Sequence, residues 1–380
     1  MTISRKEVLR LGAAGALSLA ATRASAAMAG AASIPSGRLH DPSTTELAAL
    51  TTHDLLSLPK LMPTTTLRRS GQVRHFFLTL GTANVEPLPG HSVQLPTING
   101  ISPGPILHMT EGDDVEIVVV NRLAKSTSIH WHGIPVPFPM DGVAGFSQQP
   151  IEPGEQFTYR WTAPQAGTYM YHAHFNDMDQ ASVAGMIVVA AANERSPHYD
   201  LDVPLMITSI DWEQTRNVEA QAVLANSMLM PAMAVNPKAD PNPGMGDAME
   251  RMDMVEYWCL NGKTFPATAP IRVKRGDVVR VRLGNLTHMT HPMHMHGHWF
   301  RWIAQDGVPL PQPYAMNTVP VHPGRTIDID FIANNPGVWP LHCHIISHMV
   351  DNRDLMTGLV VVIQYEGFSL PTMMTMAQGG

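Results

Sequence analysis

The chain has 380 residues, a mass of 41.5 kDa and a formal net charge of −7 at pH 7, with 44% hydrophobic and 15% charged residues. This length can bury two ordinary cores, so we expect two domains. Because the charge is negative and the body of the chain has no basic cluster, nucleic acid and anionic membranes are excluded as expected partners. The 32 prolines and 29 glycines, with short β-branched runs, favour an all-β protein.

The N-terminus has the pattern of an export signal. Residues 4–9 read SRKEVL, an apolar run follows over residues 11–21, and Ala-Ser-Ala at 24–26 forms a small-residue cleavage site. The start is similar to a twin-arginine leader with lysine in the second basic place, so we expect export to the periplasm or secretion. The run is short and rich in Ala and Gly, and no other stretch is apolar enough to predict a membrane span.

The rest of the chain contains an internal repeat. Residues 112–133 and 276–297 share a Gly-Asp turn, an apolar strand and a His-x-His-Gly motif at the same spacing, and residues 167–174 match 337–344. Each half ends in an apolar strand, so we expect one β-sandwich fold present twice. The predicted organisation is a signal peptide (1–26), an N-terminal extension (27–66), a first sandwich (67–193), a second sandwich (194–366) with a methionine-rich insert (about 225–256), and a C-terminal tail (367–380).

The most informative motif is a cysteine between two histidines, Cys343 with His342 and His344, followed by His348. In a β-strand, side chains alternate between faces, so Cys343 would point one way and its two neighbours the other. A thiolate with His348 suits a type 1 (blue) copper, and the flanking imidazoles suit a second metal centre. A disulfide with Cys259 is the alternative in an exported protein. We expect a buried free thiol at Cys259 instead, because a disulfide does not require histidines around it.

The repeat separates shared candidate ligands from those that only one half has. Eight histidines occupy equivalent places in the two halves: His130 with His294, His132 with His296, His172 with His342, and His174 with His344. Three further candidates have no counterpart, since His291, Cys343 and His348 correspond to Thr127, Ala173 and Met178. A thiolate site is thus present as a unit in the second half and missing as a unit from the first, which scattered histidines would not produce.

Together these motifs resemble the four copper motifs of the multicopper oxidases. The resemblance covers roughly residues 112–363 and is to the two-domain kind, which implies two cupredoxin-like Greek-key β-sandwiches with the type 1 copper in the second. It also implies a homotrimer, because in that group the eight histidines meet between the first domain of one subunit and the second domain of the next.

The resemblance further implies four coppers per subunit. The type 1 copper would be held by His291, Cys343 and His348, and the type 2 copper by His130 and His294. The type 3 pair would be held by His132, His172, His174, His296, His342 and His344.

The implied activity couples one-electron oxidation of a substrate at the type 1 copper to four-electron reduction of dioxygen to water at the other three. A laccase-like activity on phenols, a cuprous oxidase activity, or both are expected. Asp141 matches an acidic residue that relays protons in similar enzymes, although an Asp before a Gly is equally the pattern of a surface turn. A short insertion after His348 shifts the candidate axial ligand to Met356, with Leu355 as the alternative.

The methionine-rich insert bears on the substrate. Its methionines are Met228, Met230, Met233, Met245, Met249, Met252 and Met254. Thioethers are soft ligands that favour Cu(I), and similar insertions occur in cuprous oxidases of copper tolerance. The alternative is a mobile loop whose methionines pack over the sandwich or the trimer.

Two other functions fit parts of the pattern. A copper nitrite reductase is also a trimer of two-cupredoxin chains, but its pattern places the type 1 cysteine in the first domain, where this chain has Ala173. A non-enzymatic periplasmic copper-binding or electron-carrier protein would use the insert to sequester metal. The copper content distinguishes such a carrier from an oxidase, because only the oxidase needs all four ions.

Overall fold

The structure, a computed structural model, describes residues 72–174, 182–192, 199–211, 255–350 and 356–370. The predicted signal peptide and N-terminal extension lie outside these residues, as do most of the methionine-rich insert and of the C-terminal tail. The last two residues of the predicted insert, Val255 and Glu256, begin a strand. Within the described ranges, no helix has the length and apolar character that a membrane crossing requires.

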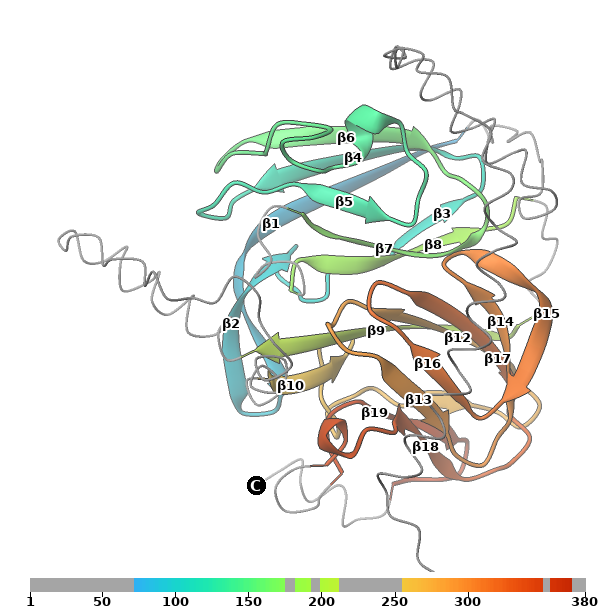
Figure 1. The fold of residues 1–380 in the computed structure, drawn as a ribbon. Helices are drawn as coiled ribbons and strands as arrows, with labels where there is room; N and C mark the ends of the chain where they lie inside the picture. Colours follow the sequence, from blue (N-terminus) through green and yellow to red (C-terminus); the bar gives the residue numbers. More distant parts are fainter. Residues whose placement is uncertain (1–71, 175–181, 193–198, 212–254, 351–355, 371–380) are drawn as a thin grey trace, which may run out of the picture. The chain divides into compact units, whose positions relative to one another are not determined.

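The first half of the described chain forms two 4-stranded sheets (Figure 1). One has the order β2 (His91–Ile98), β1 (Val73–Leu88), β4 (Asp114–Asn121), β6 (Gln156–Thr162). The other has the order β3 (Leu107–Thr110), β8 (Ala184–Ala190), β7 (Gly167–Ala173), β5 (Ile129–His132). Buried and half-buried residues alternate along β4, as expected of a strand with one face on a core. That core includes the fully buried rings of Trp131, Tyr159 and Tyr171.

The second half forms a 6-stranded and a 5-stranded sheet. The larger has the order β10 (Val255–Leu260), β9 (Leu201–Asp211), β12 (Val278–Asn285), β17 (Thr326–Ile332), β14 (Phe300–Gln305), β15 (Val308–Met316). The smaller has the order β11 (Ile271–Val273), β19 (Val360–Tyr365), β18 (Val338–Cys343), β13 (His291–Met295), β16 (Thr318–Val321). A second core, which includes Cys343, lies between them.

The two sandwiches repeat the same strand pairings. Strand β1 runs parallel to β4 as β9 runs parallel to β12, and β4 is antiparallel to β6 as β12 is to β17. In the facing sheets, β5, β7, β8 and β3 pair as β13, β18, β19 and β11 do. The duplication expected from the sequence is therefore confirmed by the topology.

Strand β7 also contacts the second sandwich through its outward face. The Thr168 hydroxyl donates to Asp328 Oδ1 at 2.6 Å, and Met170 packs in an apolar cluster with Met206. Because side chains alternate along a strand, His172 lies on the same face of β7 as Thr168 and Met170. One face of this strand thus carries both the contact to the second sandwich and a candidate ligand.

Candidate metal centres

The three residues without a counterpart in the first half lie together in the core of the second sandwich. His291 begins β13, Cys343 ends β18 opposite Met293 of β13, and His348 lies in the 3-10 helix η2 (Ile346–His348). Cys343 Sγ is 3.6 Å from Nδ1 of His291 and 3.6 Å from Nδ1 of His348, and the two nitrogens are 3.2 Å apart. All three side chains are buried. One sulfur and two imidazole nitrogens that converge in an apolar core fit a trigonal type 1 copper site.

Burial prepares these groups for a metal. Burial, together with a smaller effect of His348 nearby, lowers the pKa of His291 to about 3, and burial lowers the pKa of His348 to about 4. Both imidazoles are therefore neutral at pH 7 and have a free lone pair. Burial raises the pKa of the Cys343 thiol to about 11, so the thiol keeps its proton at pH 7 until a metal displaces it.

Both cysteines are free thiols. Cys259 in β10 packs with Val93, Leu95 and Ile210, and burial raises its pKa to about 12. The expectation of a buried free thiol at Cys259 is therefore confirmed, and the disulfide with Cys343 is not formed.

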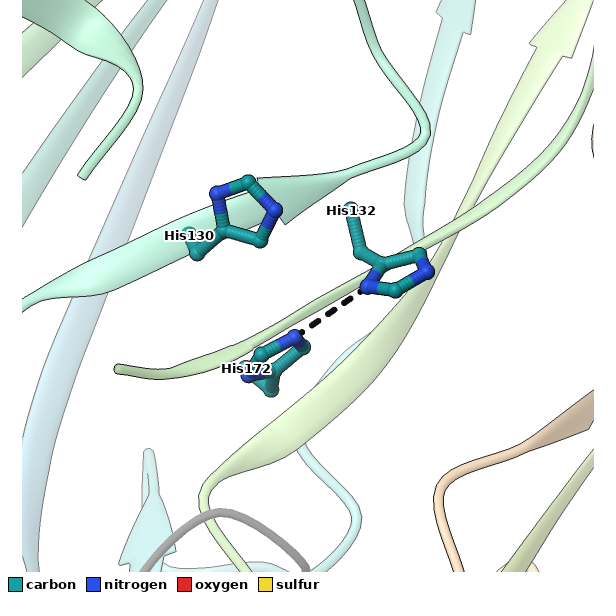
Figure 2. Close-up of side chains that lie close together, drawn as sticks. All are labelled: His130, His132 and His172. Carbon is teal, nitrogen blue, oxygen red and sulfur yellow. Dashed lines mark hydrogen bonds between the residues drawn. The ribbon is translucent and has the colours of Figure 1, made fainter. Parts of the chain in front are cut away.

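The four candidate histidines of the first sandwich lie close together. His130 and His132 project from β5 and His172 from β7, and His130 is directly opposite His172 in the sheet (Figure 2). His132 Nδ1 and His172 Nε2 are 3.3 Å apart. The His174 ring, just after β7, is 5.3 Å from that of His130. These four residues are called the first tetrad below.

Backbone carbonyls orient two rings of the first tetrad. His130 Nδ1 lies 2.8 Å from the carbonyl oxygen of Asp141, and His172 Nδ1 lies 2.8 Å from that of Ala173. When a carbonyl accepts the Nδ1 proton, Nε2 is left with a lone pair for a metal. Burial also lowers the pKa of His172 to about 4, so its ring is neutral at pH 7.

The second sandwich repeats the arrangement with His294, His296, His342 and His344, called the second tetrad below. His294 lies opposite His342, and His296 Nε2 is 2.9 Å from His342 Nε2. His294 Nδ1 contacts the carbonyl oxygen of Asn317 at 2.9 Å. His342 Nδ1 lies 2.8 Å from the carbonyl oxygen of Cys343, so the cysteine backbone orients an imidazole on the opposite face of its own strand.

The two tetrads remain separate within one chain. Among the described residues, every ring contact of these eight histidines with one another lies within one tetrad. Within the described residues, each tetrad is thus a separate set of four imidazoles.

Asp141 contacts the first tetrad mainly through its backbone. Its carboxylate oxygen Oδ1 is 3.5 Å from His130 Nδ1, farther than its carbonyl oxygen. The next residue, Gly142, has a φ of +82°, and a Cβ there would lie 1.8 Å from the carbonyl oxygen of Ile129. Glycine is therefore required at position 142, because the turn approaches β5 too closely for a side chain. The same turn places the Asp141 carboxylate beside a candidate ligand.

Of the two axial candidates, Leu355 lies outside the described residues. Met356 makes a backbone bridge with Val350, and its side chain packs with Phe265, Val360 and Val362. This apolar cluster is distinct from the core that contains Cys343. An axial role for Met356 stays a prediction.

Two residues beside the cluster of His291, Cys343 and His348 were not foreseen. The Thr287 hydroxyl is 2.7 Å from His291 Nε2, and the Trp258 ring lies against both His291 and His348. Thr287 is four residues before His291 and lies in a loop, where sequence spacing does not predict which side chains meet. Trp258 is distant in sequence, and only strand pairing brings it to the site.

Comparison with known proteins identifies the family. Residues 79–194 match a multicopper oxidase family profile, and residues 236–364 match a second one. A blue copper oxidase from Nitrosomonas europaea is 31% identical, with a TM-score of 0.66 over 78% of this chain and 86% of that chain.

Two sequence relatives match over shorter regions. Copper resistance protein A of Escherichia coli is 42% identical over 141 residues, which are 37% of this chain and 23% of that protein. Laccase-1 of Cryptococcus neoformans var. grubii is 30% identical over 253 residues, which are 62% of this chain and 38% of that protein. The chain thus spans well under half the length of these two relatives. With two cupredoxin-like sandwiches and matches to the family in both, the chain belongs to the multicopper oxidase family.

Proposed function

We propose that this protein is a multicopper oxidase that couples one-electron oxidation of a small reducing substrate to four-electron reduction of dioxygen to water. The observation that carries the proposal is the buried cluster of Cys343, His291 and His348, set one residue away from two ligands of the second tetrad. A copper in that cluster would accept electrons singly, and three coppers among the histidines would supply dioxygen reduction.

The protein's own residues would join the two kinds of site. Cys343 faces the core while His342 of the same strand and His344 just after it point to the opposite side, so a covalent path through the adjacent backbone links the thiolate to both imidazoles. His130 and His294 are the proposed type 2 ligands. Backbone carbonyls near Nδ1 leave their Nε2 atoms available for a metal, as carbonyls do for His172 and His342. The other six histidines are the proposed type 3 ligands.

We propose a homotrimer in which the first tetrad of one subunit meets the second tetrad of the next. The separation of the tetrads within one chain supports this, because eight ligands are then completed only by a second copy. Exposed apolar side chains occur close in sequence to each tetrad, Phe138 and Phe146 near the first and Trp299 and Ile346 near the second. Their burial against a neighbouring subunit would remove apolar surface from water.

A subunit-mixing experiment tests both the site and its sharing. A His172→Ala chain lacks a ligand of the first tetrad, and a His296→Ala chain lacks one of the second, so each variant alone should be inactive. After co-expression in equal amounts, about a quarter of the junctions in a trimer would join two intact tetrads. We expect roughly that fraction of wild-type dioxygen consumption. No activity in the mixed sample would contradict a site between subunits.

The reducing substrate is proposed to be Cu(I), a phenol, or both. The likeness to copper resistance protein A and the methionine-rich insert support Cu(I), and the likeness to Laccase-1 supports phenols. Export to the periplasm or outside the cell is part of the same proposal. A carrier protein is the competing function, and a sample that binds about four coppers and consumes dioxygen would exclude it.

A nitrite reductase pattern is disfavoured by one position. Ala173 lies opposite Ile129 in the first sandwich as Cys343 lies opposite Met293 in the second. A methyl group at the place of the thiolate cannot bind a type 1 copper.

A further inference from the structure

We propose that Trp258 is a positioning residue of the type 1 site, which holds the His348 ring by stacking and shields the cluster from solvent. The inference rests on the proposed function, since it assigns a role toward the same candidate copper. The centroids of the Trp258 and His348 rings are 4.1 Å apart with an angle of 30° between the planes. The Trp258 and His291 centroids are 5.1 Å apart at 69°, an edge-to-face contact. One indole thus contacts both imidazole ligands.

The two imidazoles are held by different means. His291 Nε2 is 2.7 Å from the Thr287 hydroxyl, and Asn285 Oδ1 lies 2.8 Å from that hydroxyl in turn. This chain of polar contacts orients the His291 ring, as outer partners of metal ligands commonly do.

The Nε2 atom of His348 is buried and lacks such a partner among the described residues. A ring without a polar anchor at Nε2 is free to turn about its χ2 angle unless packing prevents it. The Trp258 face provides that packing, and offset stacking of aromatic rings is favourable in addition to the burial of area.

Strand pairing explains how Trp258 reaches the site. In β10, Trp258 lies opposite Ser209 of β9. Its neighbours Tyr257 and Cys259 pack against Val93, so the alternation of side chains turns Trp258 to the other face, against the core that contains Cys343. Because β10 is the edge strand of its sheet, the indole is only partly buried. Part of the indole is thus exposed to solvent, while its ring contacts two buried histidines.

The copper-free protein gives the first test. The rate at which iodoacetamide alkylates Cys343 is measured by peptide mass spectrometry in wild type, Trp258→Phe and Trp258→Leu. We expect Trp258→Leu to raise the Cys343 rate by about three- to tenfold, because the lost stacking loosens the cover over the thiol, and Trp258→Phe to raise it less. Trp302→Leu is the matched control, since Trp302 packs on the same core without a described ring contact to His291 or His348.

Cys259 is an internal control in the same experiment. It is buried on the other face of β10, so its alkylation reports general loosening of that strand. An unchanged Cys343 rate in Trp258→Leu, or an equal rise at Cys259, would overturn the inference.

The copper-loaded protein gives the second test. We expect Trp258→Leu to bind as much copper as wild type but to show a shifted thiolate-to-copper absorption band and a shifted type 1 reduction potential, since water would come closer to the sulfur. Absence of that band in wild type would count against the proposed function itself. A wild-type band that is unchanged in both Trp258 variants would overturn only the role of Trp258.

Discussion

At the scale of single residues, the chemical difference between the two sandwiches lies at few positions. Cys343 and Ala173 occupy the same place in the duplicated fold, each as the last residue of its strand and each buried. The flanking histidines are kept in both halves. The first sandwich therefore has only imidazoles as candidate ligands, whereas the second also has the sulfur of Cys343.

The protonation states of the His291, Cys343 and His348 cluster lead to a first prediction. At pH 7 the thiol of the copper-free protein is protonated because its pKa is raised to about 11, whereas His291, with a pKa of about 3, is neutral. Binding of one Cu(I) ion in this cluster should therefore release about one proton, from Cys343. As the pH approaches the thiol pKa of about 11 the release should fall to about half a proton, and it should approach zero only above that pH, where the thiol is already ionised.

Titration calorimetry in buffers of different ionisation enthalpy measures this release. Cys343→Ser should abolish it at that site. Absence of proton release by the wild type at pH 7 would mean that the thiolate exists before the metal binds.

The proton-relay role expected for Asp141 from the family resemblance leads to a second prediction. Asp141→Asn keeps the backbone carbonyl near His130 Nδ1, so the ring should stay in place while the carboxylate is lost. Reoxidation by dioxygen should then slow by about 100-fold, a typical effect of losing a general acid, whereas reduction of the type 1 site by substrate should be unchanged. Stopped-flow measurement of the two half-reactions separates these steps. Equal losses in both would argue against a relay.

At the scale of elements, β7 connects the first tetrad to the second sandwich. The Thr168 hydroxyl donates to Asp328 and accepts from Arg282 Nη1 at 2.8 Å, and Arg282 also binds Asp202. A buried charge pair is stabilising only when its remaining polar atoms are satisfied, and Thr168 satisfies both partners. The strand that carries His172 is thus anchored by a network that spans both sandwiches.

Removal of that hydroxyl is the third prediction. Thr168→Val keeps the shape of the side chain but leaves Asp328 and Arg282 each without one buried partner, so we expect a loss of about 1–3 kcal/mol in the free energy of unfolding. Urea unfolding of the copper-free protein measures it. Thr162→Val is the control, because its hydroxyl contacts Asp114 at 3.1 Å at a half-buried position and should cost less than about 1 kcal/mol. Equal losses would argue against the anchor.

At the scale of the whole molecule, the described part of one chain presents two separate imidazole sets and one cluster that includes a thiol. The fourth prediction, recovery of activity on mixing His172→Ala with His296→Ala chains, follows from that division. Recovery of activity requires only that the intact first tetrad of one chain meets the intact second tetrad of another.

The role of the methionine-rich insert is the fifth prediction, and the fold sharpens its design. Because β10 begins at Val255, a deletion of residues 225–254 spares that strand and Trp258. We expect the deletion to lower dioxygen consumption with Cu(I) and to leave consumption with a phenol largely intact, since thioethers would capture the soft cuprous ion. Unchanged Cu(I) oxidation would exclude a cuprous role of the insert.

Much of the fold was predictable because it depends on local patterns. Apolar alternation, Gly-Asp turns and a repeated His-x-His-Gly motif were sufficient to predict an all-β chain built from one sandwich twice. The opposite orientation of Cys343 and His342 was predictable as well, because the two-residue period of a strand fixes it. Thr287 was not predictable, since its contact with His291 depends on the path of a loop.

The sequence by itself determined the two-sandwich fold and the candidate ligands, because strand periodicity and motif spacing are properties of the chain alone. Only the tertiary structure decided which groups converge. Register across β13 and β18 brings His291 to Cys343, pairing of β10 with β9 brings Trp258 over His348, and separate sheets keep the two tetrads apart. These contacts join residues far apart in sequence, and their positions depend on the packing of whole sheets, which no local pattern encodes.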